Sequence, residues 1–350
     1  MNESSDSSPG IIINLNSNYS NYQFDPFTIP VLLNIIPFIY IIPTCFVIFR
    51  IIQVYIVKGL RNNDEIVNKS VFLVIILSQL SCLCFFLSDV LIVRLPTTGI
   101  LTKWCQQQPA NHILTIVFTS QIYFAYTLMI YPVLLIVVRI TPIQYPQSHR
   151  EINSKILAYS IPFIHIYPIF FILHMIPALG VCRQLWKPYP FGCAFIHFYG
   201  SWHDLKNSPF EVINSVLWLI IFLICNFKLY QKIQNLKGTS RGNSNVNQSS
   251  RYRRAEISLT LTSGSMILTY IVNFIFQASL NQPKIWNLPF FQGTFIINFT
   301  LMTYSSFFRP YGYDLETCVV PWMLYLTHPA FQKRKESITV TPSLQRERIP

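Results

Sequence analysis

Long apolar runs alternate with short polar segments along this chain. The clearest run, 113–138, holds 26 residues and no Asp, Glu, Lys, Arg or His, and it stops at Arg139. As an α-helix it would be about 39 Å long, more than the roughly 30 Å hydrocarbon core of a bilayer. A soluble core helix of this length would normally carry a polar stripe. The pattern therefore predicts a tilted transmembrane helix.

Two similar runs precede this helix and four follow it, so the sequence predicts an all-α integral membrane protein built as a seven-helix bundle around its third span. The predicted spans are about 29–57, 70–93, 113–139, 156–177, 209–232, 256–282 and 302–327. The seventh is ambiguous, because the charged segment 309–316 separates two apolar runs. A single crossing keeps the basic tail inside, and it leaves 285–301 as an apolar outer loop.

The segments outside the spans are polar. Residues 1–28 are rich in Ser and Asn and predict a disordered extracellular tail, with glycosylation sequons at Asn2 and Asn18. Residues 234–254 predict a mobile cytoplasmic loop, and residues 328–350 a basic cytoplasmic tail. The chain opens without a basic region, so we expect the first span itself to direct insertion.

Composition and charge support a membrane protein and set its orientation. The chain is 51% hydrophobic and only 11% charged. Its net charge of +12 does not predict nucleic-acid binding, because the cations lie between apolar spans. With the N-terminus outside, 19 of the 26 Lys and Arg residues fall on cytoplasmic segments. The positive-inside rule therefore favours an extracellular N-terminus and a cytoplasmic C-terminus.

Catalytic and metal-binding patterns are absent from the sequence. We find no metalloprotease, hydrolase or phosphate-loop motif, and the dispersed cysteines do not form a zinc site. An enzyme, a cofactor or a resident metal is therefore not expected. A transporter or channel is the alternative to a receptor, but such proteins usually show internal repeats and several mid-membrane charges. This chain shows no obvious repeat.

Several stretches resemble the nematode serpentine chemoreceptors of class U. They are RPYGYDLETCVVPWMLYLTHPAFQKRK (309–335), RLPTTGILTKWC (94–105), RRAEISLTLT (253–262), and the CRQL and PFGC pieces around Cys182 and Cys193. The resemblance implies a seven-transmembrane receptor that couples a heterotrimeric G protein to an unidentified small-molecule ligand. It also implies a multi-pass protein of the plasma membrane, in a sensory neuron. Pairing with a second receptor is left open.

The sequence departs from the broader rhodopsin-like class at three points. Near the end of the seventh span, the tyrosine that usually follows the proline falls one residue late, at Tyr325 after Pro321. Arg139 lacks the usual acidic neighbour, and span six has no Trp and Pro pair. The resemblance therefore does not specify the switch mechanism.

Three cysteines fall on the side that we expect to be oxidising. We expect a disulfide from the first outer loop to the second, with Cys182 as the partner of Cys105 and Cys193 as the competitor. A closed loop of this size would stabilise the fold by up to a few kcal/mol on the chain-entropy model.

Aromatic and polar residues in the outer halves of the spans form the predicted ligand pocket. They are Tyr123, Phe124, Trp218, Phe274, Gln277, Tyr304, Phe307, Arg309 and Asp314. Ordinary packing is the competing interpretation for each aromatic side chain. Because an unpaired charge at this depth is costly, we also expect Asp89 to meet Arg309, or Arg94 to meet Asp314. Exposure to water at the pocket mouth is the alternative.

The cytoplasmic ends of spans three and six carry the predicted output switch. We expect the carboxylate of Glu256 to accept a hydrogen bond from Arg139 in the resting state, and ligand binding to tilt span six around Gly264. The alternatives are that Glu256 only neutralises a neighbouring arginine, and that Gly264 is small for packing. The basic edge expected to meet the G protein is Arg251, Arg253 and Arg254.

Overall fold

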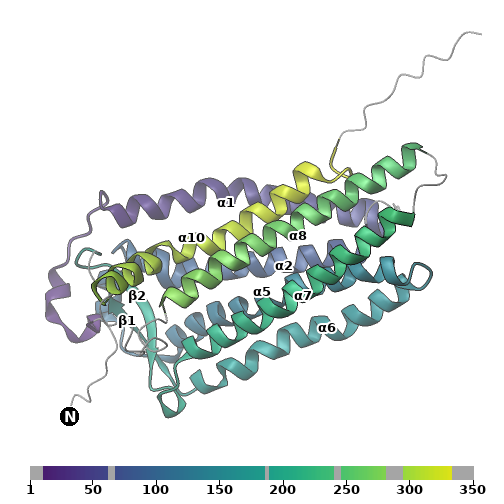
Figure 1. Ribbon diagram of the computed structural model, residues 1–350. Coiled ribbons are helices and arrows are strands. Elements are labelled where there is room, and N and C mark those ends of the chain that lie inside the picture. Colours follow the sequence, from purple (N-terminus) through teal and green to yellow (C-terminus); the bar gives the residue numbers. More distant parts are fainter. Residues whose placement is uncertain (1–10, 62–67, 186–188, 240–245, 281–294, 333–350) are drawn as a thin grey trace, which may run out of the picture.

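Seven long helices run side by side through the part of the chain that the computed structural model describes (Figure 1). That part comprises residues 11–61, 68–185, 189–239, 246–280 and 295–332. The long helices are α1 (Ile29–Val54), α2 (Lys69–Asp89), α5 (His112–Gln144), α6 (His149–Ile172), α7 (Asn207–Thr239), α8 (Val246–Leu280) and α10 (Phe295–Thr327). We call the end that holds the strands β1 and β2 the outer end, and the opposite end the inner end.

Length and hydropathy make five of these helices candidate membrane spans within the described residues. They are Ile29–Arg61, Lys69–Thr97, His112–Gln144, His149–Met175 and Asn207–Lys232. Helix α8 adds a shorter apolar stretch, Ile257–Val272. The predicted all-α membrane fold is confirmed, although a small hairpin interrupts it at the outer end.

Local sequence explains where two of the helices begin. The Asn68 side chain accepts hydrogen bonds from the backbone amides of Ser70 and Val71 at the start of α2. Asn111 caps α5 in the same way, with its Oδ1 2.9 Å from the amide of Leu114. Asparagine is a favoured N-cap because its short side chain satisfies amides that lack a partner in the first turn.

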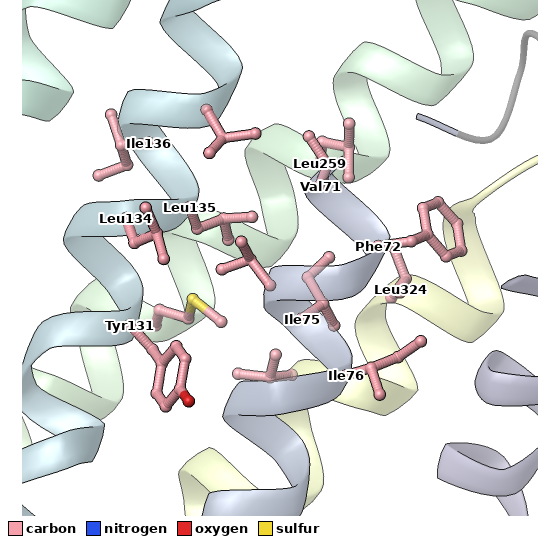
Figure 2. Close-up of a cluster of buried hydrophobic side chains, with 14 of the residues drawn as sticks. Val71, Phe72, Ile75, Ile76, Tyr131, Leu134, Leu135, Ile136, Leu259 and Leu324 are labelled. Carbon is pink, nitrogen blue, oxygen red and sulfur yellow. The ribbon is translucent and has the colours of Figure 1, made fainter. Parts of the chain in front are cut away.

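Helix α5 lies at the centre of the bundle, as the sequence predicted. Inside the bundle, 78% of its most apolar stretch is buried, against 17% for α6. Its fully buried Tyr131 and Leu135 pack with side chains of α2, α8 and α10, including Ile75, Leu259 and Leu324 (Figure 2). The apolar core therefore follows α5 toward the inner end.

Several helices are longer than the predicted spans. Helix α6 begins at His149, α10 begins at Phe295, and α7 and α8 together cover most of the predicted 234–254 loop. Once a helix has formed inside the membrane, adding a residue beyond its boundary gains one hydrogen bond without a new nucleation step. Polar residues such as Gln and Lys continue it readily. Residues 234–239 and 246–254 of the predicted mobile loop, and residues 295–301 of the predicted 285–301 loop, are therefore corrected to helix.

The predicted disorder of the N-terminal tail is wrong for residues 11–28. Short 3-10 turns η1 (Ile13–Leu15) and η2 (Ser17–Asn21) bury the side chains of Ile13 and Tyr19 completely. The tail is polar in composition, but these two apolar side chains find a surface on the outer end of the bundle. Residues 1–10, and Asn2 among them, lie outside the described residues.

Candidate functional site

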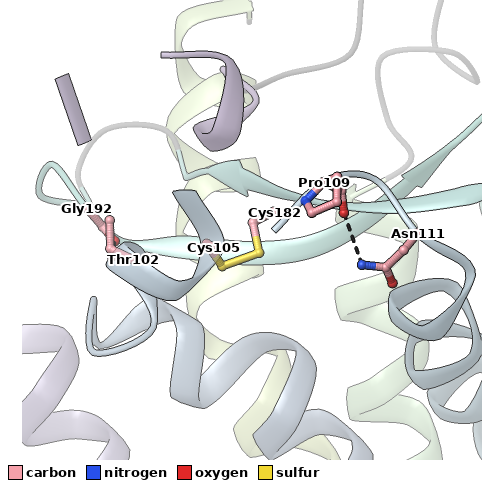
Figure 3. Close-up of a disulfide and its surroundings, with 6 residues drawn as sticks. All are labelled: Thr102, Cys105, Pro109, Asn111, Cys182 and Gly192. Atoms are coloured by element: carbon pink, nitrogen blue, oxygen red, sulfur yellow. Dashed lines mark hydrogen bonds between the residues drawn. A yellow bond between two sulfur atoms is a disulfide. The ribbon is translucent and has the colours of Figure 1, made fainter. Parts of the chain in front are cut away.

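A disulfide joins the two outer connections of the bundle. Cys105, on the short helix α4 (Thr102–Gln107), bonds Cys182 on β1 (Leu179–Gln184), with their Cα atoms 5.7 Å apart (Figure 3). The structure thus contains the expected pairing. Cys193 is a free cysteine, and burial raises the pKa of its thiol to about 12.

The second outer connection is a β-hairpin rather than an irregular loop. Strand β1 pairs antiparallel with β2 (Ala194–Tyr199), and Cys182 lies opposite Ile196. Because Asn111 forms an isolated bridge with Gly180, the hairpin is fixed to the start of α5. The disulfide and this bridge together hold the hairpin across the outer end of the bundle.

The N-terminal segment packs onto the same hairpin. The Gln184 amide donates to the carbonyl of Ile11 at 2.9 Å, and the Tyr19 ring stacks on Phe191 at a centroid distance of 4.5 Å. Gly192 has φ +92°, and a Cβ there would lie only 2.0 Å from the Tyr22 ring. Asn18 is exposed on this surface, so its sequon is accessible.

A buried guanidinium lies between two carboxylates below this cap. Arg94 follows α2 on the π-helical segment η4 (Val90–Arg94), a rare geometry that is frequent at functional sites. Its Nε lies 2.6 Å from Asp89 Oδ2, and its Nη2 lies 2.7 Å from Asp314 Oδ1. Each of the three residues is at most 5% exposed. Of the two expected ion pairs, the structure therefore contains Arg94 with Asp314.

Two further side chains complete this outer polar cluster. Gln121 of α5 donates to Asp89 at 2.6 Å, and the hydroxyl of Tyr40 on α1 donates to Asp314. The cluster thereby connects α1, α2, α5 and α10, and it satisfies both oxygens of each carboxylate. We define the outer polar cluster as Tyr40, Asp89, Arg94, Gln121 and Asp314. Arg309, the other expected partner of Asp89, has a side chain outside the described residues.

Three of the predicted pocket aromatics have described side chains, and each of these packs against a neighbouring helix. Tyr123 turns toward α6, where its hydroxyl lies 3.0 Å from His165 Nδ1, while Phe124 packs near Cys82 and Phe85. The ring of Trp218 packs edge-on against that of Tyr167, also on α6. Ordinary packing is therefore the interpretation that these three side chains support. The side chains of the remaining predicted pocket residues lie outside the description: Phe274, Gln277, Tyr304 and Phe307.

The sequence-based prediction did not include a polar stripe on α7. It places Asn207, Glu211, Asn214 and Ser215 toward the bundle, and each is buried. The hydroxyl of Tyr126 donates to Asn207 at 3.0 Å. Spacings of three and four residues put such side chains on one helix face, and in an otherwise apolar span this periodicity was the available signal.

At the inner end, Arg139 joins α5 to α8. Its guanidinium donates to the carbonyl of Leu259 at 2.9 Å, to Ser263 Oγ at 2.7 Å and to Thr260 Oγ1 at 3.0 Å. Spans three and six are thus in contact through hydroxyls and a carbonyl, whereas the predicted pair of Arg139 with Glu256 stays a prediction. The side chains of Glu256, Arg251 and Arg253 lie outside the description, whereas Arg254 is exposed.

Gly264 lies one residue beyond this contact on α8. A Cβ built there would meet no described atom within 4 Å. Close packing of a neighbour therefore does not explain the glycine among the described residues, and a role in bending stays a prediction.

Comparisons with known proteins agree with this architecture. The sequence model of a family described as "Serpentine type 7TM GPCR chemoreceptor Sru" matches residues 13–334. The chain is also similar to "Serpentine receptor class U-26" of Caenorhabditis elegans, with 35% identity over 259 residues, which cover 74% of this chain and 87% of the relative. Both descriptions are of receptors rather than enzymes.

Proposed function

This chain belongs to the Sru family of serpentine seven-transmembrane chemoreceptors, and from that membership we propose that it binds a small organic ligand and activates a heterotrimeric G protein. The observation that carries the proposal is the family match, which spans the whole helical bundle. The ligand would enter the outer half, where buried polar and aromatic side chains from four or more helices meet. The G protein would bind the inner end.

In our proposal the outer end is extracellular and the protein lies in the plasma membrane of a sensory cell. The charge distribution supports this orientation, because 19 of 26 basic residues fall on the opposite side. The disulfide and the exposed Asn18 sequon lie together at the outer end, where both modifications would be permitted.

We expect Asn18 to carry a glycan in a eukaryotic host. Asn18→Gln should increase the mobility of the receptor on a gel, and glycosidase treatment should shift this variant less than it shifts the parent. Asn226→Gln, in the middle of α7 and without a sequon, is the control. Staining of an N-terminal tag only after permeabilisation would show that the orientation is reversed.

The proposed switch is the contact between Arg139 and α8. Breaking it would let α8 move away from α5 around Gly264 and expose Arg139 with the basic edge Arg251, Arg253 and Arg254. A hydrogen bond to a charged group contributes about 1.5–3 kcal/mol, enough to change the population of an open state about ten-fold or more.

Ser263→Ala should therefore raise basal nucleotide exchange, and Arg139→Ala should remove coupling, at matched surface expression. Glu256→Gln should also raise the basal rate if its carboxylate joins the contact. Ser265→Ala is the matched control, because its hydroxyl donates to the Thr262 carbonyl of its own helix at 2.7 Å. If Ser263→Ala and Arg139→Ala both show the nucleotide exchange of the parent, the proposed switch is wrong.

The function itself is tested by reconstituting the purified receptor in vesicles. We expect it to accelerate nucleotide exchange on an added G protein, and a ligand identified from a small-molecule panel to increase the rate further. Membrane current or solute flux without any G protein, together with no effect on exchange, would instead indicate a channel or transporter.

A further inference from the structure

A second buried carboxylate lies deeper in the bundle than the outer polar cluster. Glu316 is on α10, two residues inward of Asp314, and is only 5% exposed. Its Oε1 has no hydrogen-bond partner among the described residues. Arg94 does not neutralise it, because the donors of Arg94 are directed to Asp89 and Asp314. An ionisable group in this position marks a functional site more often than a structural one.

Unpartnered polar atoms also lie on α2, the helix whose Cys82 and Phe85 cluster with Tyr313 of α10. Gln79 is 1% exposed, and within the described part of the chain neither its Oε1 nor its Nε2 has a hydrogen-bond partner. The buried hydroxyl of Ser78 has none there either. Both residues lie one helical turn inward of Cys82, which is close enough to Glu316 to interact with it electrostatically. Buried polar groups are normally hydrogen-bonded, so three such residues on two facing helices point to a bound group.

Tyrosines lie beside the same carboxylate. Tyr270 of α8 is close enough to Glu316 and to Tyr313 to interact electrostatically with both. Tyr313 in turn packs against Phe85, with ring centroids 4.4 Å apart. Aromatic rings stabilise organic cations. The surroundings of Glu316 are therefore acidic, aromatic and supplied with hydrogen-bond acceptors.

We propose that Glu316, Gln79 and Ser78 bind the ammonium group of a primary amine, and that the organic part of this ligand lies against Tyr270 and Tyr313. A primary ammonium has three N–H donors, and these residues offer a carboxylate, an amide carbonyl and a hydroxyl as acceptors. The proposal rests on the proposed receptor function and names the chemical class of its ligand.

The test measures thermal unfolding of the purified full chain in detergent at neutral pH, without a G protein. The probes are hexylamine, 2-phenylethylamine and putrescine, each compared with its alcohol analogue. We expect at least one amine, and not its alcohol, to raise the unfolding midpoint. In Glu316→Gln the half-saturating concentration should rise about ten-fold or more, since a charge-assisted bond is lost.

Two variants serve as checks. Gln79→Leu should weaken binding of the same amine. This variant keeps the test decisive if Glu316→Gln does not fold. Glu151→Gln, an exposed carboxylate paired with Lys155 at the inner end, should leave the amine effect unchanged.

The proposal is overturned if no amine stabilises the receptor, if the alcohols act equally, or if the effect persists in both Glu316→Gln and Gln79→Leu. Stabilisation by sodium chloride alone that disappears in Glu316→Gln would assign the site to an inorganic cation instead. Because no G protein is present, these outcomes leave the nucleotide-exchange test of the proposed function untouched.

Discussion

Replacing Arg94 with methionine is expected to remove most of the folded receptor from the cell surface. The substitution keeps an unbranched side chain but leaves Asp89 and Asp314 facing each other without a cation, in a site that is nearly inaccessible to water. Breaking a buried ion pair by removing one partner typically costs about 3–5 kcal/mol. That is a large fraction of the stability of a typical domain. Surface expression and the thermal unfolding midpoint measure the loss.

Lys103→Met is the matched control, since Lys103 is exposed on the neighbouring helix α4. It should behave as the parent does. Adding Asp314→Asn to Arg94→Met should recover part of the loss, because it removes one of the two uncompensated charges. Strictly additive effects in this double-mutant cycle would show that the outer polar cluster does not couple α2 to α10.

The second large effect is expected from the disulfide. Cys105→Ser and Cys182→Ser should lower stability equally, by about 2–5 kcal/mol, because each removes the same constraint on the unfolded chain. The double variant should be no worse than either single one. Thermal unfolding of the purified proteins, with and without reductant, measures these differences.

Cys193→Ser is the control for this prediction. Cys193 is buried but not bonded, so its replacement should cost far less than the other two and should leave the Cys105 and Cys182 peptides linked in a non-reduced digest. A digest that links Cys105 to Cys193 would contradict the pairing in the structure.

The cluster around Arg94 could be anticipated from the sequence because hydrocarbon makes an unpaired charge so costly. Asp89 and Arg94 lie at one end of a span, and Asp314 lies at the same depth of another, so few partners were available. The sharing of one guanidinium by both carboxylates could not be anticipated. It depends on the π-helical turn of η4, which sets where Arg94 points and which short-range sequence does not specify.

The pocket was harder to predict for a different reason. In a span that is apolar on every face, side chains toward lipid and toward the bundle have the same character, so periodicity does not separate them. Tyr123 and Phe124 were therefore assigned to a common cavity, although Tyr123 contacts His165 of α6 and Phe124 packs near Cys82 and Phe85 of α2. The buried polar residues on α7 indicate better which helix face points into the bundle, because polar side chains avoid lipid.

Amino-acid composition alone does not predict that the N-terminal segment is ordered. Its order depends on contacts with residues far along the chain, such as Tyr19 with Phe191 and Ile11 with Gln184. A polar segment with a few apolar residues can pack or remain disordered, and the surface that it meets decides between the two.

The central claim is that the contact between Arg139 and α8 closes the inner end and that a G protein binds when it opens. The most direct test is the distance between spectroscopic labels placed as unnatural amino acids at Gln144 on α5 and Ile257 on α8, both of which are exposed. In the receptor alone, we predict one short distance. Addition of nucleotide-free G protein should shift the distribution to a distance several ångströms longer. A distribution that is unchanged by a G protein shown to bind would contradict the account.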